Sequence, residues 1–243
     1  MNSNGEGFPS AAVAARVRGP SDDAQPAQAL LVSAYDRRDA WVQERDNDLS
    51  YAVEHADALG AISGLYFDGA VEARVADDSV PLASYALVDF AAGKDSVEHE
   101  AVSKAMQGRL RSYVEGGGRL ILSGEEVGYA LVQASDDADD ESFLAEVLGA
   151  VYVADDADTF TLVAPSQGPF FGLTGAFLDD GSAGVYEVVY PDVLSPAPGA
   201  SVALGWAVLY ALQALRAQVI AGWALRRTDR LLRPTTVLLA VLA

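Results

Sequence analysis

The chain has 243 residues, 51% of them hydrophobic, and a formal net charge of −19 at pH 7. A surface this acidic repels the phosphate backbones of nucleic acids and anionic lipid headgroups, so neither class of partner is expected. Cysteine is absent, which excludes disulfides, thiolate zinc sites and a cysteine nucleophile. The hydrophobic fraction is high enough for a sizeable core, and the length suits one large domain or two small ones.

The first half of the chain alternates between short apolar runs and amphipathic stretches. Apolar runs at residues 29–33, 66–67, 85–90 and 119–122 are typical of buried parallel strands, and amphipathic patterns at residues 49–61, 97–114 and 125–132 predict helices. Strands and helices that follow one another with short connections predict βαβ units around a parallel sheet. We therefore expect an α/β fold with three layers, αβα.

The second half of the chain has a different pattern, which begins at Asp136. Residues 143–148 predict a short helix, and residues 151–153, 160–163 and 185–190 predict strands among Gly, Pro and Asp turns. We interpret this part as a β-rich C-terminal extension on the same sheet.

Five segments together resemble a known family. They are residues 34–41, 51–59, 117–128 (GGRLILSGEEVG), 152–160 and 186–193. In order and spacing they resemble the glutamine-amidotransferase-like, flavodoxin-like domain that follows fibronectin type III repeats in large secreted bacterial proteins, such as N-acetylmuramoyl-L-alanine amidases and xanthan-lyase-like (golvesin-type) proteins. The resemblance implies an extracellular or cell-envelope location, other domains in a longer parent chain, and a glycan or peptidoglycan ligand.

The resemblance also predicts how the chain is divided. Residues 1–27 resemble the last strand of a fibronectin type III domain followed by a linker, and residues 28–200 form the amidotransferase-like domain. Residues 201–243 depart from the closing strand and helix that the family implies. They are interpreted as a frameshifted segment, a divergent closing helix, or a membrane helix over 202–225. Arg216 counts against the last interpretation, because a central arginine costs about 2.5–3.5 kcal/mol. The first residues show no signal-peptide pattern, so any leader is expected in the parent chain.

Candidate functional residues are expected where the parallel strands end, because ligands of open α/β sheets bind beyond the carboxyl ends of the strands. A ligand site is predicted from Tyr35, Gly93, Lys94 and Gly124. Ser123 occupies the strand-to-helix turn where the family resemblance implies a nucleophile. The other interpretation of Ser123 is a helix N-cap.

A nucleophilic serine also needs a general base within hydrogen-bond reach. The resemblance implies a histidine downstream of the nucleophile, whereas His55 and His99 both precede Ser123. His55 is either this base or a structural histidine bonded to a loop, and His99 is expected to be solvated. Gly124 follows Ser123 directly, which departs from the spacing of a nucleophile elbow.

Acidic residues offer a second kind of chemistry. Asp36 and Glu125 are expected at the same sheet edge, where a carboxylate pair would suit acid/base catalysis or cation binding. The acidic runs at 136–141 and 155–158 lack the glycine and glutamate of an EF-hand loop, so they are interpreted as solvated loops or weak surface calcium sites. No nucleotide-binding or zinc-binding motif is present, and we expect no cofactor and no metal centre.

The sequence favours a non-catalytic accessory or binding module of a larger secreted protein directed at the cell wall or at polysaccharides. The alternative is a hydrolase of amide or glycosidic bonds that uses Ser123, with His55, or the carboxylates of Asp36 and Glu125. A third interpretation is a truncated, frameshifted product with no function of its own.

Overall fold

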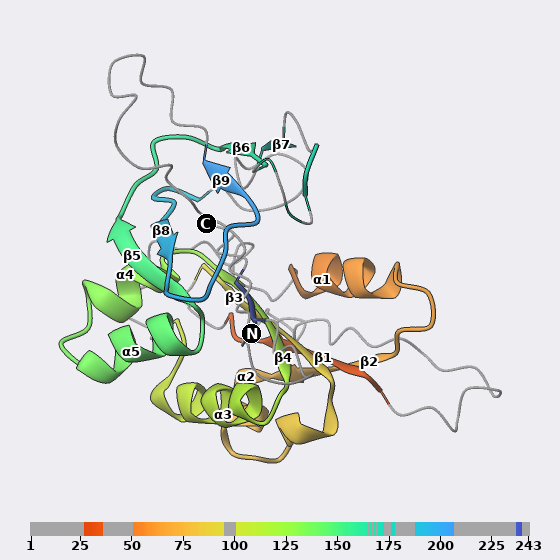
Figure 1. Ribbon diagram of the computed structural model, residues 1–243. Coiled ribbons are helices and arrows are strands. Elements are labelled where there is room, and N and C mark those ends of the chain that lie inside the picture. The colour runs from red at the N-terminus through yellow and green to blue at the C-terminus, as the bar shows by residue number, and fades with distance from the viewer. Residues whose placement is uncertain are drawn as a thin grey trace, which may run out of the picture.

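The computed structural model describes residues 27–35, 51–94, 101–164, 166, 168, 170–172, 176–177, 188–206 and 237–239. Its central sheet is parallel throughout. The strands lie in the order β2 (Phe67–Val71), β1 (Ala29–Ser33), β3 (Leu87–Gly93), β4 (Arg119–Gly124) and β10 (Val237–Leu239) (Figure 1). This is the doubly wound, flavodoxin-like order, in which the chain leaves in opposite directions from β1 and β3. The predicted α/β fold class is confirmed.

Helices cover both faces of the sheet, as the βαβ pattern predicts. They are α1 (Tyr51–Gly60), α2 (Glu72–Ala76), α3 (Lys104–Glu115), α4 (Val127–Val132) and α5 (Ala138–Glu146), with a 3-10 turn, η2, at Leu82–Ser84. Figure 1 shows α1 on one side of the sheet and α2 and α3 on the opposite side. The three layers follow from strands whose two faces are both apolar.

The core is divided by the alternation of side chains along each strand. Leu31 of β1 packs with Ala52 and Leu59 of α1, whereas Leu30 and Val32 belong to the larger cluster on the other face. That larger cluster includes Phe90, Leu122, Met106, Leu110, Phe143 and Leu144. It therefore joins the sheet to α3 and continues to α5.

The third helix begins later than its predicted start at residue 97. Residues 101–103 are not helical, and the first residue of α3 is Lys104. The Ser103 hydroxyl accepts a hydrogen bond from the Met106 amide at 3.3 Å, so Ser103 is the N-cap that fixes this start. At the other end, the Tyr113 ring takes the space that a Cβ at Gly118 would occupy, 2.3 Å from Cζ.

The β-rich extension is not part of the central sheet, and the prediction that placed it there is wrong. Strands β5 (Ala150–Ala154) and β8 (Val193–Pro196) form one antiparallel pair, and β6 (Thr161–Val163) pairs with β7 (Ala176–Phe177) and β9 (Gly205–Trp206). The edge of β4 at which they could have joined is occupied by β10. The predicted strand at 185–190 is also wrong where it can be compared, since residues 188–190 are not in a strand and 185–187 lie outside the described residues.

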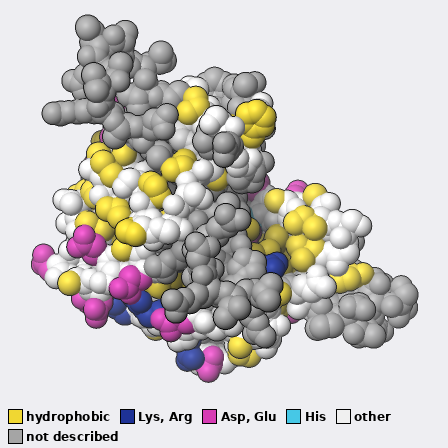
Figure 2. All heavy atoms as spheres, viewed as in Figure 1, with side chains coloured by type: hydrophobic (Ala, Val, Ile, Leu, Met, Phe, Trp, Pro, Cys, Tyr) yellow, Lys and Arg dark blue, Asp and Glu magenta, His cyan; other side chains and the backbone are white. Residues whose placement is uncertain are grey.

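The other edge of the central sheet is β2. Asp68 is the second residue of this strand, and its carboxylate accepts a hydrogen bond from the Tyr85 hydroxyl at 2.9 Å. Apolar side chains are exposed elsewhere, including Val151 and Val153 of β5. Figure 2 shows apolar side chains gathered on the side of the molecule where β5 lies in Figure 1. The exposed face of β5 is consistent with an antiparallel pair that is packed on one side only.

Both ends of the chain lie largely outside the described residues. The predicted fibronectin-like remnant at 1–27 is described at residue 27 alone, and the candidate membrane segment 202–225 is described only as far as 206. The described parts of 201–243 pair with β6 and β4. Within the described part of the chain, no helix combines the length and apolar character needed to span a membrane.

Candidate functional site

The carboxyl ends of β1, β3 and β4 meet at one edge of the sheet. Gly93 pairs with Gly124 there, and Tyr35 follows β1 at the point where the chain turns away from β3. Gly93 has a φ of +64°, and a Cβ on it would lie 2.5 Å from Cγ of Tyr35. Tyr35 is only 3% exposed, so its ring is packed beside Gly93 at the edge of the sheet where ligands of this fold usually bind. Lys94 lies in the next turn, and Asp36 lies outside the described residues.

Ser123 lies within β4 and is buried. It pairs with Ala91 of β3, and the sheet contact continues to Glu125, whose amide donates to the Gly93 carbonyl at 2.7 Å. The interpretation of Ser123 as a helix N-cap is wrong. The N-cap of α4 is Glu126, which has a φ of +55° and makes no side-chain capping bond. Because the strand runs on to Gly124, the helix begins too late for Ser123 to cap it.

Glu125 is buried and binds the backbone of a distant segment. Its Oε1 accepts a hydrogen bond from the Val189 amide at 3.2 Å. Asp192, three residues after Val189, is completely buried and lies against the first turn of α4. Its Oδ2 accepts from the Gly128 amide at 2.7 Å, and its Oδ1 from the Tyr129 amide at 3.2 Å.

Asp192 was not among the residues predicted from the sequence. The pKa of Asp192 is raised to about 8. Burial is the main cause, the negative charges of Glu126 and Asp155 add to it, and the two backbone hydrogen bonds act in the opposite direction. Tyr152 is affected by the same neighbours, since burial, Asp155 and Asp192 raise its pKa to about 12. A proline and an aspartate after the predicted strand at 185–190 suggested only a turn, and no local pattern marked this carboxyl as buried.

His55 is paired with Asp89, a residue of β3 that the sequence also did not single out. Nδ1 of His55 lies 2.9 Å from Oδ2 of Asp89, and the two side chains are 21% and 6% exposed. Burial lowers the pKa of His55, but the hydrogen bond and charge of Asp89, with the charge of Glu54, outweigh burial and the net pKa is raised. His55 is thus bonded to a strand and not to a loop. His99 lies outside the described residues.

The second oxygen of Asp89 distinguishes this pair from an ordinary surface contact. Oδ1 is buried and accepts no hydrogen bond from the described part of the chain. Two residues further along these strands, the same face of the sheet carries Ser33, Ala91 and Ser123. No hydrogen bond joins His55 to Ser123 among the described residues.

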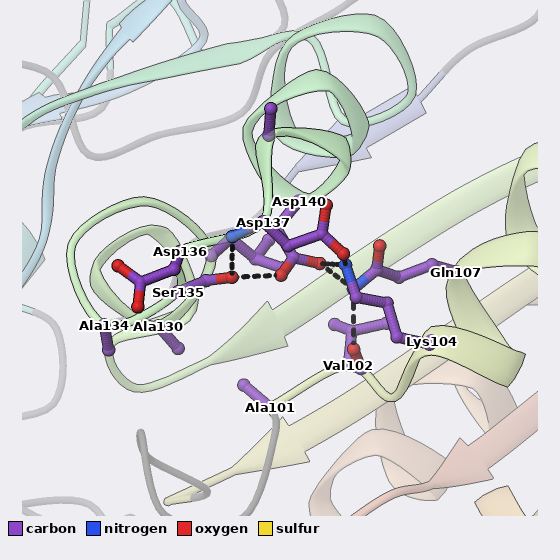
Figure 3. A pocket seen from close by; sticks show the side chains of 12 residues that line it. Ala101, Val102, Lys104, Gln107, Ala130, Ala134, Ser135, Asp136, Asp137 and Asp140 are labelled. Atoms are coloured by element: carbon purple, nitrogen blue, oxygen red, sulfur yellow. Dashed lines mark hydrogen bonds and ion pairs between the residues drawn. The ribbon is translucent and has the colours of Figure 1, made fainter.

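A cavity of about 550 Å³ lies between α3, α4 and α5 (Figure 3). Its polar wall is a cluster around Asp140, which is 6% exposed. Oδ1 of Asp140 accepts from Nζ of Lys104 and from Nε2 of Gln107, each at 2.6 Å, and Oδ2 accepts from the Ser135 hydroxyl. Lys104 also lies 2.7 Å from Asp137.

The rest of the cavity lining is apolar. It is formed by small side chains, Ala101, Ala130, Ala134 and Ala138, with Val102 and Leu131. The cavity therefore combines methyl groups with a fixed set of hydrogen-bond donors and acceptors. The acidic run at 136–141, which the sequence predicted as a solvated loop or a weak surface calcium site, lines part of this cavity. Lys104 and Gln107 were not singled out, because they belong to a different helix from Asp140.

The two acidic runs have different structures. Asp137 is the N-cap of α5, and its Oδ1 accepts from the Asp139 amide at 2.9 Å, so the first run is partly helix and not simply a solvated loop. In the second run, Asp156 accepts from the Asp158 amide at 2.7 Å in a local turn. Among the described residues, no group of three or more His, Cys, Asp or Glu side chains is arranged to hold a metal ion.

Comparisons with known proteins identify neither a family nor a function for this chain. No family model matches the chain, and no curated protein matches it. Among solved structures, the chain is similar to one described as the mmIFT52 N-terminal domain, with 15% sequence identity and a TM-score of 0.37 over 73% of this chain and 72% of that chain. A likeness this distant bears on neither the family nor the function of the chain.

Proposed function

We propose that this chain is a non-catalytic binding module of a larger secreted protein directed at the cell wall or at polysaccharides, and that it binds a neutral glycan. The observation that carries the proposal is the cavity between α3, α4 and α5. Its volume falls within the range of roughly 300–1,000 Å³ that is usual for small-molecule sites. The extracellular parent protein is supported by the sequence resemblance alone.

The chemistry of the cavity suits a ligand rich in hydroxyl groups. Two carboxylates fix the ammonium of Lys104, and Asp137 is half exposed, so donor and acceptor groups stand at defined positions on one wall. A hydroxyl group can both donate and accept, whereas an anionic ligand would meet three aspartates (Asp136, Asp137 and Asp140) that line the same cavity. The alanine side chains of the cavity lining provide apolar contact for the carbon skeleton of a sugar.

The side chains predicted for catalysis support a non-catalytic role, because no hydrogen bond joins His55 to Ser123 among the described residues. Glu125 instead accepts a hydrogen bond from the Val189 amide. A general base must instead lie within hydrogen-bond reach of the nucleophile it activates. The possible pair of Asp36 with Glu125 remains a prediction, since Asp36 lies outside the described residues.

Isothermal titration calorimetry with neutral oligosaccharides and soluble peptidoglycan fragments tests the proposal. We expect saturable binding, and at least a tenfold loss of affinity in an Ala134→Phe variant, whose ring would fill the cavity from an exposed position. Ala61→Phe, at an exposed position after α1, is the matched control and should bind normally. If the natural protein binds none of these ligands, or if Ala134→Phe binds as well as Ala61→Phe, the proposal is wrong.

A second candidate function is hydrolysis of an amide or glycosidic bond. The observation that favours it is the His55–Asp89 pair, in which a buried carboxylate holds a histidine on the sheet face that also carries Ser123. Turnover of a glycan or peptidoglycan substrate that falls at least a hundredfold in Ser123→Ala or His55→Gln would support it. Turnover that is unchanged in these variants and in Glu125→Gln would end it.

A further inference from the structure

The segment Val188–Asp192, here called the strap, crosses the turn between β4 and α4. Val189 and Tyr190 are exposed, at 57% and 49%, whereas Val188 and Asp192 at the two ends are completely buried. The strap is attached to the extension as well, because the Ala157 amide donates to the Pro191 carbonyl at 2.9 Å. It is therefore a surface segment held at both ends by buried groups.

The contact between the strap and α4 is close. A Cβ on Gly128 would lie 2.8 Å from Cδ2 of Leu194 and 3.0 Å from Oδ2 of Asp192. The bonds from Asp192 to the Gly128 and Tyr129 amides join residues 64 and 63 positions apart in the chain. The strap can thus leave the turn only if these two bonds break and the Asp192 carboxyl enters water.

The groups that face Asp192 are acidic. Among the described residues they include Glu126 and Tyr129 at the start of α4, Tyr152 of β5, and Asp155 just after β5. Tyr129 and Tyr152 pack edge to face, with ring centroids 6.3 Å apart. An ionised Asp192 would have to be held among these groups without contact with water, which is the costly form of a buried carboxyl.

We propose that the strap is a closure over the β4–α4 turn that is held shut by the protonated Asp192 carboxyl and weakens when that carboxyl ionises. When it opens, it withdraws the Val189 amide from Glu125 and uncovers the turn at Glu125 and Glu126, which directly follows Ser123 and Gly124 of β4. Burial raises the pKa of Asp192 to about 8 in the closed form, whereas the open form has the ordinary pKa of an aspartate. At any pH between these two pKa values, Asp192 therefore binds a proton when the strap closes. Closure then weakens by at most about tenfold per pH unit over that interval.

Hydrogen exchange in the complete chain, corrected for the intrinsic pH dependence of exchange, tests this closure. We expect the protection of residues 126–130 and 188–192 to fall at least tenfold between pH 6 and pH 8. In Asp192→Asn, which imitates the protonated carboxyl, the protection should change less than twofold. Asp57→Asn, at an exposed position on α1, is the matched control and should behave like the natural protein.

A second variant keeps the proposal testable if Asp192→Asn does not fold. Asp155→Asn removes one of the charges that raise the pKa of Asp192, so the fall in protection should end at a lower pH than in the natural protein. Equal protection at pH 6 and pH 8 in the natural protein would overturn the proposal, and so would an undiminished fall in Asp192→Asn. Neither result would affect the glycan proposal, because no residue of the strap lines the cavity.

Discussion

The cluster around Asp140 should contribute measurably to stability, and an Asp140→Asn substitution is the sharpest test. Asp140 accepts hydrogen bonds from Lys104 and Gln107 of α3 and from Ser135, and thereby ties α5 to α3. A hydrogen bond to a charged group contributes about 1.5–3 kcal/mol, against about 0.5–1.5 kcal/mol for a neutral one. The asparagine keeps the shape but not the charge. With three such bonds weakened by about 1 kcal/mol each, we expect a loss of about 2–3 kcal/mol in the free energy of unfolding.

The dependence on pH gives this prediction a second test. Burial alone would raise the pKa of Asp140, but the hydrogen bonds from Lys104, Ser135 and Gln107, and the charge of Lys104, outweigh burial and lower it. A lowered pKa in the folded protein means that the stabilisation is present above the unfolded pKa and is lost as the pH falls through the folded pKa. The difference between the natural protein and Asp140→Asn should therefore be constant from pH 5 upward and shrink below about pH 4.

Urea unfolding followed by far-ultraviolet circular dichroism measures both effects. Asp137→Asn is the matched control, because Asp137 also pairs with Lys104 but is half exposed, and asparagine caps a helix as well as aspartate does. Its loss should be clearly smaller than that of Asp140→Asn, because solvent screens an exposed ion pair. If Asp140→Asn costs no more than Asp137→Asn, the buried cluster does not stabilise the junction of α3 and α5, and the reasoning fails.

Three further predictions concern the His55–Asp89 pair, the contact of α4 with the strap, and an exposed glycine of α3. The pKa of His55 is raised in the folded protein, so the stabilisation that His55 provides is complete below pH 6.5 and is lost as the pH rises through the folded pKa. In urea unfolding, the stability difference between the natural protein and His55→Gln should therefore be larger at pH 5.5 than at pH 8.5. Gly128→Ala should destabilise by about 1–3 kcal/mol, because its Cβ would lie 2.8 Å from Leu194. Gly108→Ala, where nothing lies within 4 Å of the added Cβ, should instead stabilise α3 by about 0.5–1 kcal/mol in thermal unfolding.

The central sheet could be predicted because its signals are local. Leu30 and Val32 face one helical layer while Ala29 and Leu31 face the other, so β1 is apolar at its first four positions and is recognised without knowledge of its neighbours. Strands β3 and β4 also contain apolar runs, at 87–88 and 90–92 and at 120–122. Helix α2 was missed because five residues are too few to show a helical period.

The pairing of strands and the buried polar contacts could not be predicted, because they depend on groups far apart in the chain. Asp89 belongs to an otherwise apolar strand, and only the position of α1 brings His55 to it, 34 residues away. Asp192 was seen as a turn residue, although packing of the extension buries it completely. Whether β5 joins the central sheet depends on whether the edge of β4 is free, and a strand more than a hundred residues away decides that.

The position of Asp68 in the edge strand β2 affects how copies of this protein behave in concentrated solution. An edge strand offers unpaired amides and carbonyls to any other strand that can align with it, which is a route to aggregation. A second strand added at β2 would meet the Asp68 carboxylate, which the Tyr85 hydroxyl holds in place. Gly69 beside it further weakens the preference for an extended pairing. Replacing Asp68 by an apolar residue would remove this protection and favour edge-to-edge association of separate molecules.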